Sequence, residues 1–226
     1  MHIEQGTRLT EAGVGVGIVK SIVGINNREV TVAGEAAHAG STPMLDRSDA
    51  LAAAAASILD LESAAEECAT GSEAAVGTTG KGDVSPNARN IVPEEVQLQL
   101  DIRDVSHETM DRLVDRCRSR LARLQRRRDV ETPLERYRDS EPSQMSERCI
   151  SAAGAAAEAC GSDAIRLHSG AMHDTANVAA VTDAGLLFAP SEGGVSHSLR
   201  EWTDWEGCAV ATAVLAETVR SLARRG

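Results

Sequence analysis

Five of the six histidines in this 226-residue chain lie beside glycine, serine or acidic residues and outside the regular helical patterns: His2, His38, His168, His173 and His197. A neutral imidazole nitrogen is a common zinc ligand, and imidazole also serves as a general acid or base or as a hydrogen-bond donor to an oxyanion. A lone histidine is more often structural, and we interpret His107, near the start of a surface helix, and His168 in this way. The other four are the candidate site residues.

The middle of the chain, residues 26–139, must position one of these histidines. Its pattern reads strand, helix, strand, strand, helix, strand. In 96–103, apolar and polar residues alternate as in a half-buried strand. Residues 50–67 predict a helix with one apolar face formed by Leu51, Ala55, Ile58, Leu59 and Ala65. Ser106 is a suitable N-cap for the second helix. This order predicts a ferredoxin-like βαββαβ module with its helices on one face of the sheet.

The remaining segments, residues 1–25 and 140–226, must position the other three candidates. Pro142 and its polar neighbours mark a boundary, after which strands alternate with helices such as 147–159 and a last helix from Trp205. Alternation of this kind predicts an α/β layer. Because residues 140–226 contain too few elements to close a core, we expect residues 1–25 to pack with them.

Six short segments, in this order, carry a resemblance to a known family: His2-Ile3-Glu4-Gln5-Gly6, Ala37-His38-Ala39-Gly40-Ser41-Thr42-Pro43-Met44, Asn90-Ile91-Val92-Pro93, Asp101-Ile102-Arg103, Ser169-Gly170-Ala171-Met172-His173-Asp174 and Gly194-Val195-Ser196-His197-Ser198. Together they resemble the zinc-dependent amidohydrolase branch of the M20 metallopeptidase superfamily. That branch contains N-carbamoyl-L-amino acid hydrolases, β-ureidopropionases and allantoate amidohydrolases. The resemblance implies a catalytic α/β domain with a two-zinc centre and an inserted ferredoxin-like lid that forms a homodimer.

The resemblance also implies a role for each candidate residue. His2 would be a ligand of one zinc ion and His197 a ligand of the other. His38, on the lid, would reach into the partner subunit's site and stabilise the oxyanion. The chemistry implied is hydrolysis of a linear C–N bond in a small carbamoyl or ureido acid, with zinc polarising the carbonyl group.

The implied substrate contacts come from both parts of the chain. Arg103 would clamp the substrate carboxylate, for which a planar guanidinium is suited, and Asn90 would contact the substrate beside it. Gln5 and His173 would be further substrate-site residues. Met172 stands where the family usually has glycine, so its side chain would enter the substrate site.

The family's other zinc ligands and its glutamate base lie in the first half of its catalytic domain, and no segment of this sequence resembles that half. We therefore expect the chain alone to bind zinc weakly or not at all and to be inactive. Three functional classes stay open: an enzyme whose other half is supplied elsewhere, a non-catalytic dimerisation or binding module, and a fragment of an M20 aminoacylase or peptidase. The third is disfavoured because those enzymes usually carry aspartate where His2 stands.

Composition disfavours several classes of binding partner. The net charge of −11 and the pI of about 5.0 disfavour nucleic acid, and Arg126–Arg128 is best explained as a solvated helix end. The sequence has no apolar run of the roughly 18 residues that cross a bilayer and no signal segment, so we expect a cytoplasmic protein that does not bind membranes. The five cysteines show no CxxC pattern, which disfavours both disulfides and a thiolate zinc site.

Overall fold

The computed structural model describes residues 1–224 and divides the chain into two compact units. One unit, Gly24–Pro142, is contiguous, and we call it the insert unit. The other combines Met1–Val23 with the chain from Ser143 onward, and we call it the discontinuous unit. The bounds expected from the sequence, 26–139, fall two or three residues inside the insert unit.

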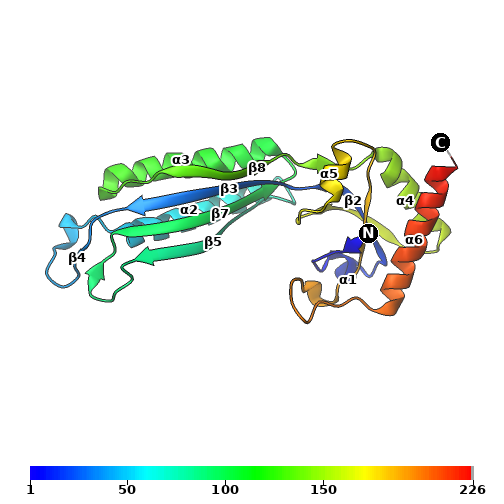
Figure 1. Ribbon diagram of the computed structural model, residues 1–226, viewed down its shortest axis with the longest axis horizontal. Coiled ribbons are helices and arrows are strands. Elements are labelled where there is room, and N and C mark those ends of the chain that lie inside the picture. Colours follow the sequence, from blue (N-terminus) through cyan, green and yellow to red (C-terminus); the bar gives the residue numbers. More distant parts are fainter. Residues whose placement is uncertain (225–226) are drawn as a thin grey trace. The chain divides into compact units, whose positions relative to one another are not determined.

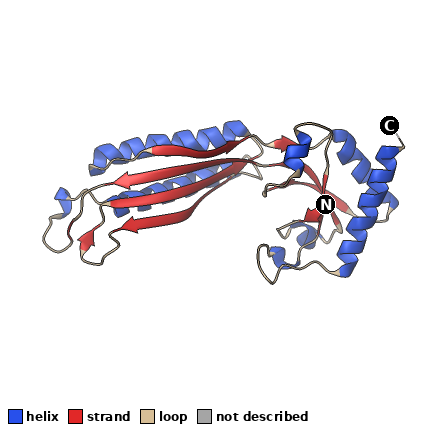
Figure 2. Ribbon diagram, in the orientation of Figure 1, coloured by secondary structure: helices blue, strands red, loops and turns tan. Residues whose placement is uncertain are grey.

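The insert unit is a four-stranded antiparallel sheet with two long helices on one face (Figures 1 and 2). The strands lie in the order β5-β7-β3-β8, which is the ferredoxin-like arrangement. Side chains from alternate strand positions, such as Val30, Val32, Leu98 and Ile102, pack against the helices. The elements are β3 (Gly24–Ala33), α2 (Ala50–Ala69), β5 (Val76–Ser85), β7 (Glu95–Asp104), α3 (His107–Arg128) and β8 (Leu134–Ser140).

Helix α2 buries a different face from the one that the sequence predicted. Four of the five predicted residues, Leu51, Ala55, Ile58 and Leu59, are exposed, and only Ala65 is buried. The buried face is formed largely of small residues, together with Leu61: Ala50, Ala53, Ala54, Ser57, Ala64 and Ala65. Small side chains let the helix approach the sheet so closely that a Cβ atom on Gly77 of β5 would lie 3.0 Å from Leu61. The larger apolar side chains therefore form an outward stripe.

A short two-stranded sheet, β4 (Ala37–His38) paired with β6 (Ile91–Val92), and the 3-10 helix η1 (Met44–Asp46) complete the insert unit. Only two residue pairs hold β4 to β6, so the sequence pattern gave no strand signal here.

The discontinuous unit is a mixed sheet with helices packed against it, which confirms the predicted α/β class. Strand β2 is central, flanked by β10 in parallel and by β11 in antiparallel orientation, with β1 parallel to β11 at the edge. Phe188, Leu9 and Val19 are among the fully buried core residues. The elements are β1 (His2–Ile3), α1 (Arg8–Ala12), β2 (Val16–Ile22), β9 (Ser143–Gln144), α4 (Glu147–Ala159), β10 (Ala164–Ser169), α5 (Thr175–Ala179), β11 (Leu186–Ala189), η2 (Glu192–Gly194) and α6 (Trp205–Ala223).

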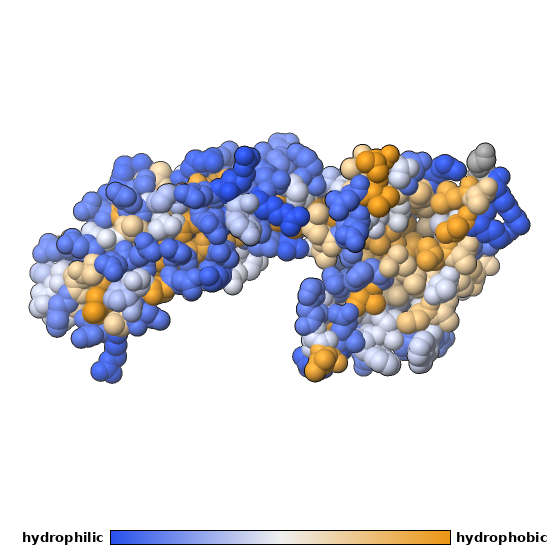
Figure 3. All heavy atoms as spheres, in the orientation of Figure 1, coloured by the Kyte–Doolittle hydropathy of each residue, from blue (hydrophilic) through white to orange (hydrophobic). Residues whose placement is uncertain are grey.

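Surface hydropathy differs between the two units. Hydrophobic residues gather on the visible face of the discontinuous unit around α6, whereas the insert unit is mostly hydrophilic on the face shown (Figure 3). Trp205 and Val181 are each 84% exposed. None of the helices in the described residues is long and apolar enough to cross a membrane.

Candidate active-site residues

The turn from β1 to α1 presents His2 and Gln5, and Glu4 holds this turn in place. The two carboxylate oxygens of Glu4 accept hydrogen bonds from the backbone N–H groups of Arg8 and Leu9, each at 2.9 Å. These are N–H groups at the start of α1, which have no partner within the helix. Gln5 adopts a left-handed conformation with φ of 59°, which is unusual for a residue with a side chain. The capped turn therefore imposes the conformation of Gln5.

His2 and His173 lie together, as two members of the predicted site. Pairing of β1 with β11 places His2 opposite Phe188, and the loop after β10 brings in His173. The His2 and His173 rings meet edge to face, with centroids 4.8 Å apart, and the His173 and Phe188 centroids are 5.5 Å apart. The His2 Nδ1 atom is 2.9 Å from the carbonyl oxygen of Ile3 and donates a proton to it, since a carbonyl can only accept. This hydrogen bond leaves the lone pair of neutral His2 on Nε2.

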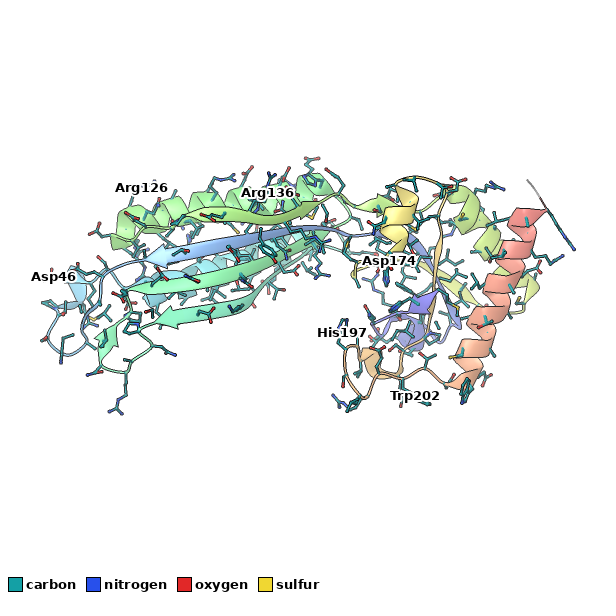
Figure 4. All side chains as sticks on the ribbon, viewed as in Figure 1. Asp46, Arg126, Arg136, Asp174, His197 and Trp202 are labelled. Carbon is teal, nitrogen blue, oxygen red and sulfur yellow. The ribbon has the colours of Figure 1, made fainter. Side chains whose placement is uncertain are left out.

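His173 is half-buried between β10 and α5, next to the exposed Asp174 labelled in Figure 4. Its Nε2 atom is 3.0 Å from the Oγ atom of Ser169. Burial is the main cause that lowers the pKa of His173, followed by electrostatic interaction with His2 and with the chain N-terminus, while Asp174 acts in the opposite direction. These effects favour a neutral imidazole.

Met172 is partly buried, and its side chain packs against the hydrophobic core of the discontinuous unit. The predicted intrusion of Met172 into a substrate site stays a prediction.

His197 lies in the loop between η2 and α6 (Figure 4) and is exposed. Its φ of 56° is left-handed, and its backbone N–H donates to the Oε2 atom of Glu201 at 2.8 Å. This contact holds the loop in a conformation that histidine rarely adopts.

The described residues contain no group of three or more His, Cys, Asp and Glu side chains placed to hold a metal ion. His2 does have the arrangement typical of a zinc ligand, in which one ring nitrogen donates to a backbone carbonyl and the other is available for the ion. One such side chain is not a site, because structural and catalytic zinc centres need three or four protein ligands. The described part of the chain therefore does not fit a complete zinc centre.

His38 and Asn90 meet at one end of the insert unit. His38 belongs to β4, and Asn90 directly precedes its partner β6, with the Ala39 N–H donating to the Asn90 carbonyl at 3.0 Å. The Nδ1 atom of His38 accepts hydrogen bonds from the N–H groups of Gly40 and Ser41, at 3.0 and 3.1 Å. Neutral His38 therefore carries its proton on Nε2, the arrangement needed to donate to an oxyanion.

Arg47 was not among the residues predicted to matter for the site. Its Nη2 atom donates to the carbonyl groups of Ala39 and Thr42, at 2.7 and 2.8 Å. It thereby ties together the two ends of the loop that follows His38. The interaction joins an arginine to backbone carbonyls, and such pairing has no local sequence signature.

Arg103 lies elsewhere in the insert unit, near the end of β7. Its Nε and Nη2 atoms donate to the two carboxylate oxygens of Asp101, at 2.7 and 2.9 Å, and this hydrogen bonding raises the pKa of Arg103. Strand β7 begins at Glu95, just after β6, so eight residue steps of roughly 3.3 Å, about 26 Å, separate Arg103 from the β4–β6 end. Within one chain, Asn90 therefore does not lie beside Arg103, and their contact with one substrate stays a prediction.

Almost the whole length of this chain is similar in sequence to known proteins. Residues 21–129 match the peptidase dimerisation domain of the M20 family. An N-carbamoyl-L-amino acid amidohydrolase of Geobacillus stearothermophilus is 40% identical over 99% of this chain and 54% of its own length. The allantoate amidohydrolase of Bacillus subtilis is 33% identical, over 99% of this chain and 53% of its own length.

The fold agrees with this relationship. A crystal structure of an amidase of the hydantoinase/carbamoylase family from Burkholderia multivorans superposes with a TM-score of 0.90 and 30% identity, over 96% of this chain and 52% of that chain. The chain thus spans about half the length of the relatives that it matches.

Proposed function

Because the chain belongs to the M20 family of peptidases and amidohydrolases, we propose that it takes part in hydrolysing the linear C–N bond of N-carbamoyl-L-amino acids. The observation that carries the proposal is the His2–His173 pair, positioned by β1 and by the loop after β10 in a chain 40% identical to such an enzyme. Histidine at position 2 disfavours an M20 peptidase or aminoacylase. His2, Gln5 and His173 would form the part of the site that the discontinuous unit provides.

The activity would require polypeptide beyond the described residues. The curated relatives are about twice as long, and the discontinuous unit exposes large apolar side chains, including Val181, Trp202 and Trp205. Such a surface is typical of a protein interface. The alternative function is a dimerisation module without catalysis, in which no further polypeptide completes the catalytic site.

One experiment separates the two. The chain is assayed for ammonia release from N-carbamoyl-L-amino acids, allantoate and dipeptides, first alone and then joined to the remaining region of the Geobacillus relative. We expect turnover of the carbamoyl substrates by the joined protein only, and loss of that turnover in its His2→Ala variant. A folded joined protein without turnover would contradict the proposal and favour the module.

Zinc is the metal that we propose for the complete site, with His2 and His197 as two of its ligands. A bound zinc ion would polarise the scissile carbonyl group and favour deprotonation of a water molecule. Because the described residues do not form a closed ligand set, the chain alone should hold less than about one zinc ion after dialysis, measured by atomic emission. Two zinc ions retained per chain would contradict this.

We also propose a homodimer through the insert unit. Strand β5 is the edge of its sheet and carries an exposed Val76, and α2 packs beside β5 with its outward stripe of Leu51, Ile58 and Leu59. Apolar helix faces and free strand edges are surfaces that a second copy can cover. The dimer would also explain the position of His38, because a substrate held by Arg103 is too far from His38 of the same chain.

The dimer is testable with matched variants. Leu59→Arg changes an exposed residue of the stripe, 63% accessible, and should convert a dimer of about 48 kDa into a monomer in light scattering at micromolar concentration. Val219→Arg, at a position on α6 that is 57% exposed, should leave the mass unchanged. A monomeric unmodified chain would reject the proposed interface. A cytoplasmic location is part of the proposal, and the five free cysteines suit a reducing compartment.

A further inference from the structure

Ser169, the last residue of β10, contacts both the backbone of the loop that follows β10 and the His173 ring in that loop. Its side chain is almost fully buried, at 1% exposure. The Oγ atom lies 2.8 Å from the Ala171 carbonyl oxygen, 3.2 Å from the Ala171 backbone nitrogen and 3.0 Å from the His173 Nε2 atom. One hydroxyl group therefore serves three polar neighbours.

The single proton of this hydroxyl decides how the three contacts work. The Ala171 carbonyl has no proton, so the 2.8 Å contact between the two oxygens requires Ser169 to donate there. The two lone pairs of Oγ are then left for the Ala171 N–H and for the His173 ring. Because Oγ can only accept from the ring, the His173 Nε2 atom must carry a proton.

We infer that Ser169 is a positioning residue that fixes His173 as the Nε2–H tautomer and so leaves Nδ1 as the only acceptor of the ring. In the described part of the chain, Nδ1 has no hydrogen-bond partner. An acceptor in this place selects a substrate group that donates a proton, such as the N–H groups of a carbamoyl or ureido substrate. This substrate assignment rests on the proposed function, whereas the tautomer does not.

Packing around the ring supports the assignment. His173 is held edge to face against His2, at 4.8 Å between centroids, and against Phe188, at 5.5 Å. These contacts restrict rotation of the ring, so the nitrogen that faces Ser169 stays the same one. A fixed ring and a fixed tautomer together define which atom meets the substrate.

Nitrogen-15 NMR of the histidine-labelled chain, with chelator present and no substrate, tests the tautomer directly. We expect a directly detected Nε2–H signal for His173, assigned by its loss in His173→Gln, and a nitrogen shift at Nδ1 typical of an unprotonated ring nitrogen. In Ser169→Ala this proton should exchange with water at least about tenfold faster. Ser169→Thr, which keeps the hydroxyl group, should retain the signal.

The chain contains a matched control. The Ser21 Oγ atom is 2.8 Å from the His168 Nδ1 atom, a second serine–histidine contact in the same unit. Ser21→Ala should change the His168 signals and leave those of His173 unaltered. A protonated Nδ1 on His173, or a Ser169→Ala spectrum identical to that of the unmodified chain, would overturn the inference. Failure of the catalytic assay alone would leave these spectra unchanged, so the two proposals fail separately.

Discussion

Replacing Glu4 by glutamine should destabilise the turn that carries His2 and Gln5. Glu4 is 9% exposed, and its carboxylate accepts two backbone hydrogen bonds at the start of α1. The amide of glutamine keeps one acceptor oxygen, which can serve one of the two backbone N–H groups. Its NH2 group would face the second backbone N–H, and that N–H would then have no acceptor. Helix N-termini also favour negative charge, which the substitution removes.

The magnitude follows from these contacts. A buried hydrogen bond to a charged group contributes about 1.5–3 kcal/mol, and the bond that remains becomes a weaker, neutral one. Glu4→Gln should therefore cost about 2–4 kcal/mol locally, which corresponds to at least about 30-fold faster amide exchange at Arg8 and Leu9. Hydrogen exchange followed by mass spectrometry measures this, with peptides of the insert unit as an internal reference.

Glu11→Gln is the matched control, since it removes an equal negative charge close to the start of the same helix. Glu11 is exposed and accepts one hydrogen bond, from the Thr7 hydroxyl at 2.6 Å. It should cost less than about 0.5 kcal/mol. If Glu4→Gln and Glu11→Gln accelerate exchange equally, the capping explanation is wrong.

Three further changes test the insert unit. Burial raises the pKa of Cys117 to about 11 from the model-peptide value of 9.0, so the folded thiol stays protonated where the unfolded thiol ionises. Stability should fall by about 2 kcal/mol more between pH 9 and 11 than in Cys117→Ala, as measured by urea unfolding; parallel pH curves would argue against this. Leu61→Ala, at a core position, should cost about 2–4 kcal/mol in the same assay, whereas Leu59→Ala should cost under about 0.5, and equal losses would contradict the face assigned to α2. Gly34→Ala should unfold the unit or lower its melting temperature strongly, because the new Cβ atom would overlap the Ser48 carbonyl oxygen. A thermal melting curve, followed by circular dichroism, that equals the curve of the unmodified chain would refute this.

The longer elements were predictable because their patterns are periodic. The helix over 147–159 and the alternating strand β7 match their expected ranges to within a residue. The apolar face of α2 was predicted wrongly, since a helix rich in alanine offers small residues on every side. Hydropathy favours the side with several leucine and isoleucine residues, but close approach to the sheet favours the side formed largely of alanine.

The site was predictable only in part. The types of its residues were recognisable from short segments, and the structure brings His2 together with His173, and His38 together with Asn90. The elements that hold them, β1, β4, β6 and α1, are two to five residues long, too short for any periodicity. The distance of Arg103 from Asn90 follows from the length of β7, which separates residues that are close in sequence.

The junction between the two units has a consequence for the order of folding. On one side of it Ile22 pairs with Ser143, and on the other Ile25 pairs with Ser140. If the discontinuous unit formed first, joining β2 to β9 would close a loop of about 120 residues, which costs about 3 kcal/mol more than closing a short turn, at about 0.6 kcal/mol per doubling. A folded insert unit already holds its two ends together, which shortens this loop to the size of a hairpin. The insert unit should therefore act as the template on which the two separated segments of the other unit meet.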